Sequence, residues 1–419
     1  MFPIGLSLAE YINVLEGKNE KCEIMSINRR NFLSVFASGV LSFGFLKNFK
    51  TNPEQGVGNE ENQPFKIKKY NPLGNTGFKV SDVSCGAISL FNPNVLRYAY
   101  ECGVNYFDTA ESYLRTKSET FIGQALKDVR DKVIITTKHA YRGKKKIEKS
   151  AIIKRIEASL KRLQTDYIDI ALIHNIDDLS ILKNEELLSA YYQLKKEGKI
   201  RFTGFSTHNM KVTLKQALDN DYKDFVQVIL FIYNHLEGKE IEPLIEKVRK
   251  KGIGTIAMKV FAGGKQGNLK KFVSKKVSYP QAAIRWVLSN PYIDCCIVTM
   301  SSYSHVEEYV AASGKPLQRA DLKVISEYQR EVSGLYCRVS CDKCLSSCPN
   351  NVAINEILRY GMYFEDYRME KEAVRYYAEL EEKKKPLFCS NCPGYCEKAC
   401  PYGLKVKDKL LHVHEILTV

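Results

Sequence analysis

The feature that most constrains this chain is a regular alternation of short β-rich runs with longer segments of helical period, from about Lys66 to Met300. The predicted strands are Val83–Gly86, Tyr106–Asp108, Val133–Lys138, Ile168–His174, Ile200–Ser206, Val226–Tyr233, Gly254–Lys259 and Cys296–Met300. Eight βα units in roughly 230 residues predict an α/β fold, a (β/α)₈ TIM barrel. The rival, an open doubly wound sheet, needs a glycine-rich phosphate loop after its first strand, and "VSCGAISLFN" does not supply one.

The segments on either side of this pattern predict the domain organisation. Residues 65–80, "FKIKKYNPLGNTGFKV", are two short alternating runs around an Asn/Pro/Gly turn, which is typical of a β-hairpin. Between the predicted strands, residues 148–164 place Ile152, Ile156, Leu160 and Leu163 on one helical face. We expect a barrel over residues 65–330 and a small, mostly helical domain over 331–419. Residues 48–64 are polar and have the composition of a linker.

In a barrel of this kind the chemistry lies where the strands end, at the C-terminal face. The second predicted strand ends at Asp108, with Tyr113 five residues later, the third ends at Lys138, and the fourth ends at His174. Each residue alone has a structural explanation, but together they form a proton-donating site. A phenol titrates near pH 10, so an acid acting at neutral pH needs a lowered pKa, which a nearby ammonium provides. The carboxylate would hold the ammonium, and the imidazole would orient a carbonyl.

Several segments in order carry a resemblance: "YNPLGNTGFKVSDVSCG", "GVNYFDTAESY", "SETFIGQAL", "RDKVIITTK", "SLKRLQTDYIDIALIH" and "GKIRFTGFS". From about Tyr70 to Gly314 the chain resembles the aldo/keto reductase superfamily. The resemblance implies that the four residues at the strand ends are a catalytic tetrad acting on a small carbonyl or alcohol. It also implies a nicotinamide cofactor, NAD(P)H, across the rim. The predicted cofactor contacts are Ser206 and Gln227 near the carboxamide and Phe261 against the nicotinamide ring, together with Lys259, Thr299 and Ser301.

The chain departs from the family pattern at two places. Thr207 and His208 follow Ser206, where the family usually has asparagine. After the eighth predicted strand, "VTMSSYSHVEEY" lacks the Lys or Arg residues that commonly hold an NADP 2′-phosphate. Lys259, at the end of the seventh predicted strand, is an amine at the rim that could contact an acidic substrate or a phosphate.

Eight of the 13 cysteines fall in two short groups. They are Cys337, Cys341, Cys344 and Cys348 in "CRVSCDKCLSSCP", and Cys389, Cys392, Cys396 and Cys400 in "CSNCPGYCEKACP". Gaps of two and three residues ending in Cys-Pro are typical of [4Fe–4S] ligation by four thiolates per cluster. Zinc accepts such pairs without explaining the Cys-Pro endings, and disulfides would favour wider spacing. The other cysteines (Cys22, Cys85, Cys102, Cys295 and Cys296) stand in apolar context and are expected to be small buried hydrophobes.

The segment between the two groups is helical by period, and the whole tail resembles ferredoxin-type extensions on some aldo/keto reductases. In two-cluster ferredoxins the fourth cysteine of each group binds the other cluster. By that analogy Cys337, Cys341, Cys344 and Cys400 would bind one [4Fe–4S] cluster. Cys389, Cys392, Cys396 and Cys348 would bind the second.

Near the N-terminus, an apolar run extends to Leu46 and follows Arg29-Arg30-Asn31-Phe32-Leu33. The run is short for a bilayer span and fits the hydrophobic region of a signal peptide. The paired arginines resemble a twin-arginine (Tat) signal, which we place in residues 1–47, with Met25 as the expected initiator methionine. The resemblance implies export of the folded protein. No clear Ala-x-Ala site follows, which leaves open a retained anchor. The alternative is an N-terminal amphipathic or buried helix, and the protein would then be cytoplasmic.

Clusters assembled in the cytoplasm and exported intact would place this protein in the periplasm or cell envelope. The net charge of +15 predicts a solvated basic surface and no nucleic-acid partner, because the basic runs are short and no nucleic-acid motif is present. Membrane contact is expected only through the N-terminal segment. The leading hypothesis is an oxidoreductase that passes electrons through its clusters to a redox partner protein. The alternatives are an electron-transfer protein whose barrel is a docking domain and a barrel kept as a noncatalytic scaffold.

Overall fold

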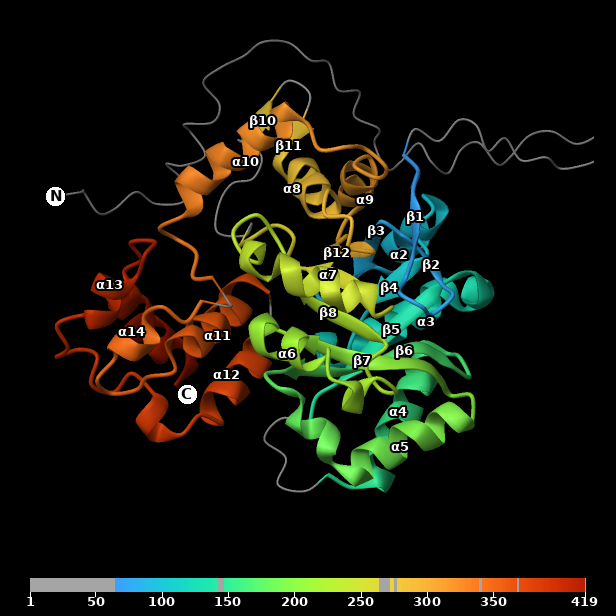
Figure 1. Cartoon of the computed structure of the whole chain (residues 1–419), viewed down its shortest axis with the longest axis horizontal. Helices are drawn as coiled ribbons and strands as arrows, with labels where there is room; N and C mark the ends of the chain where they lie inside the picture. Colours follow the sequence, from blue (N-terminus) through green and yellow to red (C-terminus); the bar gives the residue numbers. More distant parts are fainter. Residues whose placement is uncertain are drawn as a thin grey trace, which may run out of the picture. The chain divides into compact units, whose positions relative to one another are not determined.

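The computed structural model describes residues 65–418 except 142–146, 264–271, 275–276, 339–340 and 368, and its centre is a closed barrel of eight strands (Figure 1). The strands are β3 (Val83–Gly86), β4 (Tyr106–Asp108), β5 (Ile134–His139), β6 (Ile168–Ile176), β7 (Ile200–Thr207), β8 (Val228–Ile232), β9 (Gly254–Met258) and β12 (Cys295–Thr299). All neighbours are parallel, and β12 closes the barrel against β3 with Cys296 opposite Val83. The predicted (β/α)₈ barrel is confirmed, and each predicted strand overlaps an observed one. The predicted export signal and linker lie outside the described residues.

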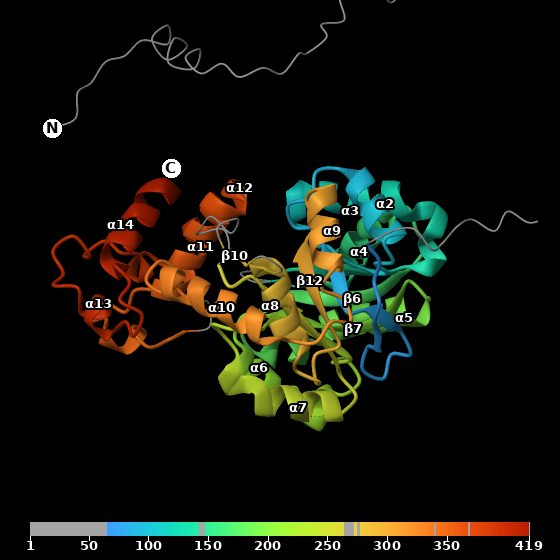
Figure 2. The same ribbon diagram turned by 90° about the horizontal axis from the view of Figure 1, so that it is seen from above.

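Helices surround the strands, as Figures 1 and 2 show. They are α2 (Pro93–Glu101), α3 (Lys117–Leu126), α4 (Lys149–Leu163), α5 (Glu185–Lys196), α6 (Met210–Gln216), α7 (Glu242–Lys250), α8 (Tyr279–Leu288), α9 (Tyr303–Val310) and α10 (Arg319–Val332). In α4 the predicted apolar face is confirmed, because Ile152, Ile156, Leu160 and Leu163 are all buried. Two further short strands, β10 (Val273–Ser274) and β11 (Val277–Ser278), pair between β9 and α8.

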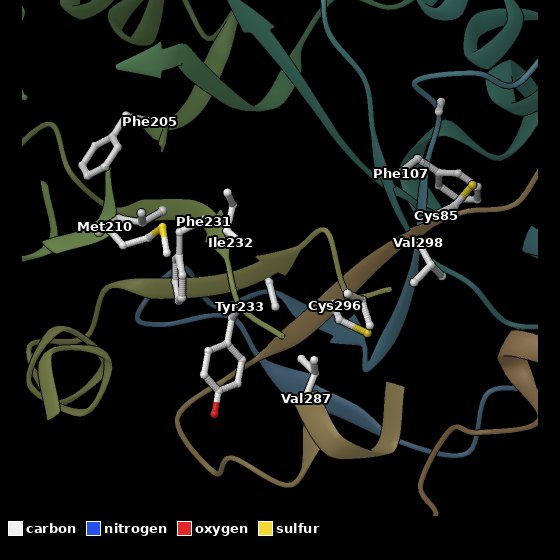
Figure 3. Close-up of a cluster of buried hydrophobic side chains, with 14 of the residues drawn as sticks. Cys85, Phe107, Phe205, Met210, Phe231, Ile232, Tyr233, Val287, Cys296 and Val298 are labelled. Carbon is white, nitrogen blue, oxygen red and sulfur yellow. The ribbon is translucent and has the colours of Figure 1, made fainter. Parts of the chain in front are cut away.

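Alternate residues of each strand enter two different apolar layers, as expected for strands buried on both faces. In β6, Ile170 and Leu172 belong to the barrel interior, whereas Ile173 belongs to the layer between strands and helices. Figure 3 shows part of this outer layer, including Phe107 and Phe231. The predicted hairpin, β1 (Tyr70–Pro72) with β2 (Lys79–Ser81), contributes Leu73 and Val80 to the interior cluster. The four scattered cysteines that the structure describes, Cys85, Cys102, Cys295 and Cys296, are buried, as predicted.

One glycine shows how tightly two barrel strands approach. A Cβ atom on Gly204 of β7 would overlap the carbonyl oxygen of Val228 in β8. A side chain at position 204 would therefore force β7 and β8 apart. Ser206 lies two residues further along β7, where it pairs with Leu230 of β8.

Beyond α10 the described chain is helical, with α11 (Ile354–Asp366), α12 (Glu370–Ala378), α13 (Tyr395–Ala399) and α14 (Val406–Leu417). Helix α11 packs against α12 and against α14, where Gly361 lies close to Val413. The barrel and these helices belong to one compact unit, and the predicted domain boundary at residue 330 falls near the end of α10. In the described part of the chain, no helix combines the length and apolarity needed to cross a bilayer.

Candidate active site

The structure brings the four predicted catalytic residues together at the C-terminal ends of β4, β5 and β6. Lys138 of β5 donates hydrogen bonds of 2.6 Å to Asp108 Oδ1, at the end of β4, and to the Thr109 carbonyl. The Lys138 ammonium lies 5.0 Å from the ring centre of Tyr113. The rings of Tyr113 and His174 meet edge to face at 5.7 Å. An acid, an ammonium, a phenol and an imidazole therefore share one site.

A tight turn presents Tyr113 to this site. The 3₁₀ turn Tyr113–Thr116 is followed by α3, and its residues Leu114, Arg115 and Thr116 have φ values of 50°, 54° and 73°. Consecutive left-handed residues other than glycine are costly, and such strain concentrates at functional sites. The turn leaves Tyr113 buried, with 8% of its surface exposed.

Burial governs the protonation of the site. It raises the pKa of Tyr113 well above 10, and Asp108 and the phenols of Tyr363, Tyr376 and Tyr367 act in the same direction. The expectation of a lowered phenol pKa is therefore wrong in the free protein. The physical reason is that Tyr113 is desolvated and the Lys138 ammonium is already bonded to Asp108. Burial likewise lowers the pKa of His174 well below 6.5, with the Lys138 charge as a second cause, so the imidazole is neutral.

The four residues lie in the lining of a cavity of about 340 Å³. The cavity lining also contains five of the six predicted cofactor contacts: Ser206, Lys259, Phe261, Thr299 and Ser301. The sixth, Gln227, lies just before β8, where its side-chain oxygen accepts hydrogen bonds from Lys195 Nζ (2.8 Å) and from the Thr203 amide (3.1 Å). Thr203 is in the first half of β7, so Gln227 lies towards the N-terminal end of the barrel. The structure does not bring Gln227 together with the others.

Asn175, which the sequence analysis did not single out, fits a nicotinamide carboxamide. It follows His174, has a φ of 55°, lines the cavity, and donates its backbone N–H to Ser206 Oγ at 2.8 Å. Its buried side-chain oxygen has no hydrogen-bond partner among the described residues. Such an orphaned acceptor matches the amide donor of a carboxamide. The left-handed backbone of Asn175 depends on tertiary structure, because asparagine does not require this conformation. No local sequence signal therefore identifies Asn175 as a cofactor contact.

The far side of the cavity is built by the C-terminal helices, which the sequence analysis also missed. Four tyrosines of α11 and α12 and of the turn between them, Tyr360, Tyr363, Tyr367 and Tyr376, line the cavity opposite the strand ends, and we name them the tyrosine wall. Tyr336, the residue before Cys337, lines it as well. Helical period places such residues on one face but cannot distinguish a face in a core from a face on a cavity.

The eight predicted ligand cysteines fall into two spatial sets. A small cavity is lined by Cys337, Cys341, Cys344 and Cys400, which we name the proximal set because Cys337 adjoins Tyr336. The distal set is Cys348, Cys389, Cys392 and Cys396. Burial raises the pKa of Cys389 to about 11, and the nearby thiols of Cys348, Cys396 and Cys392 raise it further. The four cysteines of the distal set therefore lie close together.

None of these eight cysteines forms a disulfide within the described residues, and each fourth cysteine of the sequence pattern lies with the opposite group. The backbone N–H of Val352 donates to Cys348 Sγ at 3.4 Å. Among the described residues, no group of three or more His, Cys, Asp or Glu side chains is arranged to hold a metal ion. A [4Fe–4S] cluster differs from a single ion in that its four thiolates surround a cube of four irons.

Comparison with known proteins agrees with the barrel. The model of the aldo/keto reductase family matches residues 92–273. L-galactose dehydrogenase of Arabidopsis thaliana is 32% identical over 276 residues, which cover 57% of this chain and 86% of that protein. This chain belongs to the aldo/keto reductase family. An aldo-keto reductase of Alternaria alternata is 25% identical over 343 residues, which cover 63% of this chain and 92% of that protein.

Solved structures support the fold of this family member. A holo-form aldo-keto reductase from Bacillus halodurans superposes with a TM-score of 0.51 at 24% identity, covering 63% of this chain and 96% of that structure. The aldo/keto reductase match thus accounts for the barrel. As a member of this family the protein is an oxidoreductase, and aldo/keto reductases typically use NAD(P)H.

Proposed function

We propose that this aldo/keto reductase interconverts a small carbonyl and its alcohol, with Tyr113 as the proton donor. The Lys138 ammonium, paired with Asp108, would stabilise the Tyr113 phenolate, and His174 would orient the carbonyl. The observation that carries the proposal is the buried pair of Lys138 and Asp108, at 2.6 Å, beside the Tyr113 ring on the wall of a cavity. A purely structural ion pair has no need of a phenol and a neutral imidazole at the same place.

Each residue of the site has a role in the reduction. Neutral His174 can donate an N–H to the carbonyl oxygen, and Tyr113 can give that oxygen its proton as negative charge develops there. The high pKa of Tyr113 keeps the phenol protonated at neutral pH, and an alkoxide is a stronger base than a phenolate, so the transfer is favourable. The Lys138 ammonium then stabilises the phenolate that remains.

A nicotinamide coenzyme would supply the hydride to the carbonyl carbon and would itself be oxidised, so that one hydride and one proton convert carbonyl to alcohol. Asn175 and Ser206 would hold its carboxamide, and Phe261, Thr299 and Ser301 would contact the rest. Lys259 lines the same cavity, although its ammonium also lies near two tyrosine rings. The experiment is to titrate anaerobically purified protein with NADH and NADPH and to follow carbonyl-dependent oxidation of either coenzyme.

The proposal includes two [4Fe–4S] clusters, one on the proximal set and one on the distal set, in a ferredoxin-type C-terminal region. Its support is the Cys-Pro spacing together with the two spatial sets, each of which takes one cysteine from the opposite group. Protein purified without oxygen should carry close to eight irons and eight sulfides per chain. Stoichiometric zinc, or iron near four, would contradict two clusters.

We further propose that the folded protein is exported by the Tat route and that its clusters exchange electrons with a redox partner protein outside the cytoplasm. The twin-arginine pattern and the cluster cysteines support each other, because only a route for folded proteins carries assembled clusters. Replacing Arg29 and Arg30 by lysine should retain the protein in the cytoplasm, whereas unchanged fractionation would refute export by this route. If no carbonyl is turned over while the clusters exchange electrons, the electron-transfer alternative is correct.

A further inference from the structure

The tyrosine wall is a continuous aromatic surface. The ring centres of Tyr360 and Tyr376 are 5.6 Å apart, those of Tyr363 and Tyr367 are 6.0 Å apart, and Tyr363 and Tyr376 are 6.5 Å apart. These separations lie in the range in which aromatic rings attract one another. The four rings therefore form one connected array that spans α11, α12 and the turn between them.

This array faces the reacting end of the cavity. Phenols of Tyr363, Tyr376 and Tyr367 are close enough to Tyr113 to oppose its ionisation. The same cavity is lined by the tyrosine wall on one side and by Tyr113, Lys138 and His174 on the other. A molecule bound beside Tyr113 in this cavity therefore has the tyrosine wall among its surroundings.

Contacts to the barrel hold the tyrosine wall in place. The ammonium of Lys259, just beyond the end of β9, lies 5.0 Å from the Tyr367 ring centre and 5.5 Å from that of Tyr363. Tyr336, at the start of the C-terminal segment, donates a hydrogen bond of 2.8 Å to buried Glu237. A Cβ atom on Gly263, whose φ is 72°, would overlap the Tyr336 ring, so this contact has no room for a side chain. The Lys259 contacts thus join the tyrosine wall to the barrel, and the Tyr336 contacts anchor the start of the segment that carries it.

We propose that the tyrosine wall selects the substrate, and that the substrate is a carbonyl or alcohol carried directly on a single flat aromatic ring. This inference rests on the proposed carbonyl–alcohol chemistry of the same site. A cavity of about 340 Å³ is at the small end of ligand sites, and it must also hold the reacting end of the coenzyme, so one ring fills the remaining space. An aromatic ring stacks on tyrosine faces, whereas a saturated ring of the same size gains only apolar contact.

The test compares benzaldehyde with cyclohexanecarbaldehyde in turnover assays with the full-length, anaerobically purified protein. Both carry the aldehyde on a six-membered carbon ring, which is flat, aromatic and conjugated with the carbonyl only in benzaldehyde, so the comparison uses KM and not kcat. Binding of the corresponding alcohols, benzyl alcohol and cyclohexylmethanol, is measured by calorimetry and does not depend on turnover. One stacked ring is worth about 2- to 13-fold in affinity. We expect the aromatic member of each pair to have the lower KM and Kd by that factor.

Two variants keep the test independent of folding. Tyr363→Leu and Tyr376→Leu retain apolar volume and remove one ring each, and each should reduce the aromatic preference towards unity. The matched control is Tyr192→Leu, because Tyr192 in α5 is 42% exposed and is absent from the cavity lining. This control should leave the preference unchanged.

The outcomes distinguish this inference from the proposed function. Tight binding of benzyl alcohol with no turnover of any carbonyl would overturn the proposed chemistry and support the tyrosine wall as an aromatic site. Turnover with equal KM for both aldehydes, or an unchanged preference in both variants, would overturn the inference and leave the chemistry intact. Faster oxidation of L-galactose than of benzyl alcohol by the oxidised coenzyme would also overturn it, since a sugar needs a hydrogen-bond partner for each hydroxyl.

Discussion

Replacing Tyr113 by phenylalanine tests the proposed proton transfer most directly. The ring remains, so the edge contact with His174 at 5.7 Å and the ammonium of Lys138 at 5.0 Å are both retained. The fold should lose at most about 1 kcal/mol, the usual worth of one hydrogen-bonding hydroxyl. General acid catalysis contributes about 10²–10⁴-fold, which corresponds to about 3–5 kcal/mol of barrier. We therefore expect kcat to fall by that factor while coenzyme binding is unchanged.

The assay is anaerobic oxidation of NADH or NADPH by benzaldehyde, followed by absorbance, with urea unfolding as the stability measurement. Tyr191→Phe is the control, because Tyr191 is fully buried, its hydroxyl lies 3.3 Å from that of Tyr141, and it does not line the cavity. This control removes a buried phenol hydroxyl without touching the site. Undiminished kcat in Tyr113→Phe would refute Tyr113 as the donor, and equal losses in both variants would show that any buried hydroxyl matters as much.

Three further outcomes are expected. Lys138→Met should lower the free energy of unfolding in urea by about 3–5 kcal/mol, because it leaves the buried Asp108 charge unpaired. Adding Asp108→Asn to this variant should restore part of the loss. An undiminished free energy of unfolding in Lys138→Met alone would contradict this expectation. Cys348→Ser should reduce iron from about eight to about four per chain and remove the electron paramagnetic resonance signal of the cluster on the distal set. Loss of the cluster on the proximal set instead would show that the four cysteines of each sequence group bind the same cluster. Burial and the Arg338 charge lower the pKa of His235 to about 3, so only the unfolded state binds this proton as the pH falls below about 6.5. Between pH 7.5 and 5.5 the free energy of unfolding should therefore fall by about 1.4 kcal/mol more in the wild-type protein than in His235→Gln. Equal falls in the two proteins would refute a neutral His235.

The barrel could be predicted because its signal is local. Each strand is a short run of β-branched and aromatic residues, each helix repeats its apolar residues at helical spacing, and eight repeats leave few folds to choose from. The tetrad was predictable for a related reason. Parallel strands of a barrel end on one face, so the residues at the ends of β4, β5 and β6 had to meet.

The rest depends on contacts that the sequence does not order. The pKa of Tyr113 rises partly because Tyr363, Tyr367 and Tyr376, more than 200 residues later in the sequence, approach it in space. Gln227 was placed at the rim because it matches a family position, but it precedes the first residue of β8. A short shift along a strand decides which end of the barrel a side chain reaches. Asn175 was missed for the opposite reason, since its role follows from a backbone conformation alone.

The division of the cavity between two parts of the chain has an evolutionary consequence. The four predicted catalytic residues lie within residues 108–174, whereas the tyrosine wall lies within residues 360–376 and follows the barrel in the sequence. Mutations in α11 and α12 can therefore reshape one side of the cavity while the strand ends stay untouched. New members of such a lineage could arise by exchange of the C-terminal gene segment, each inheriting the same barrel with a different partner helix pair.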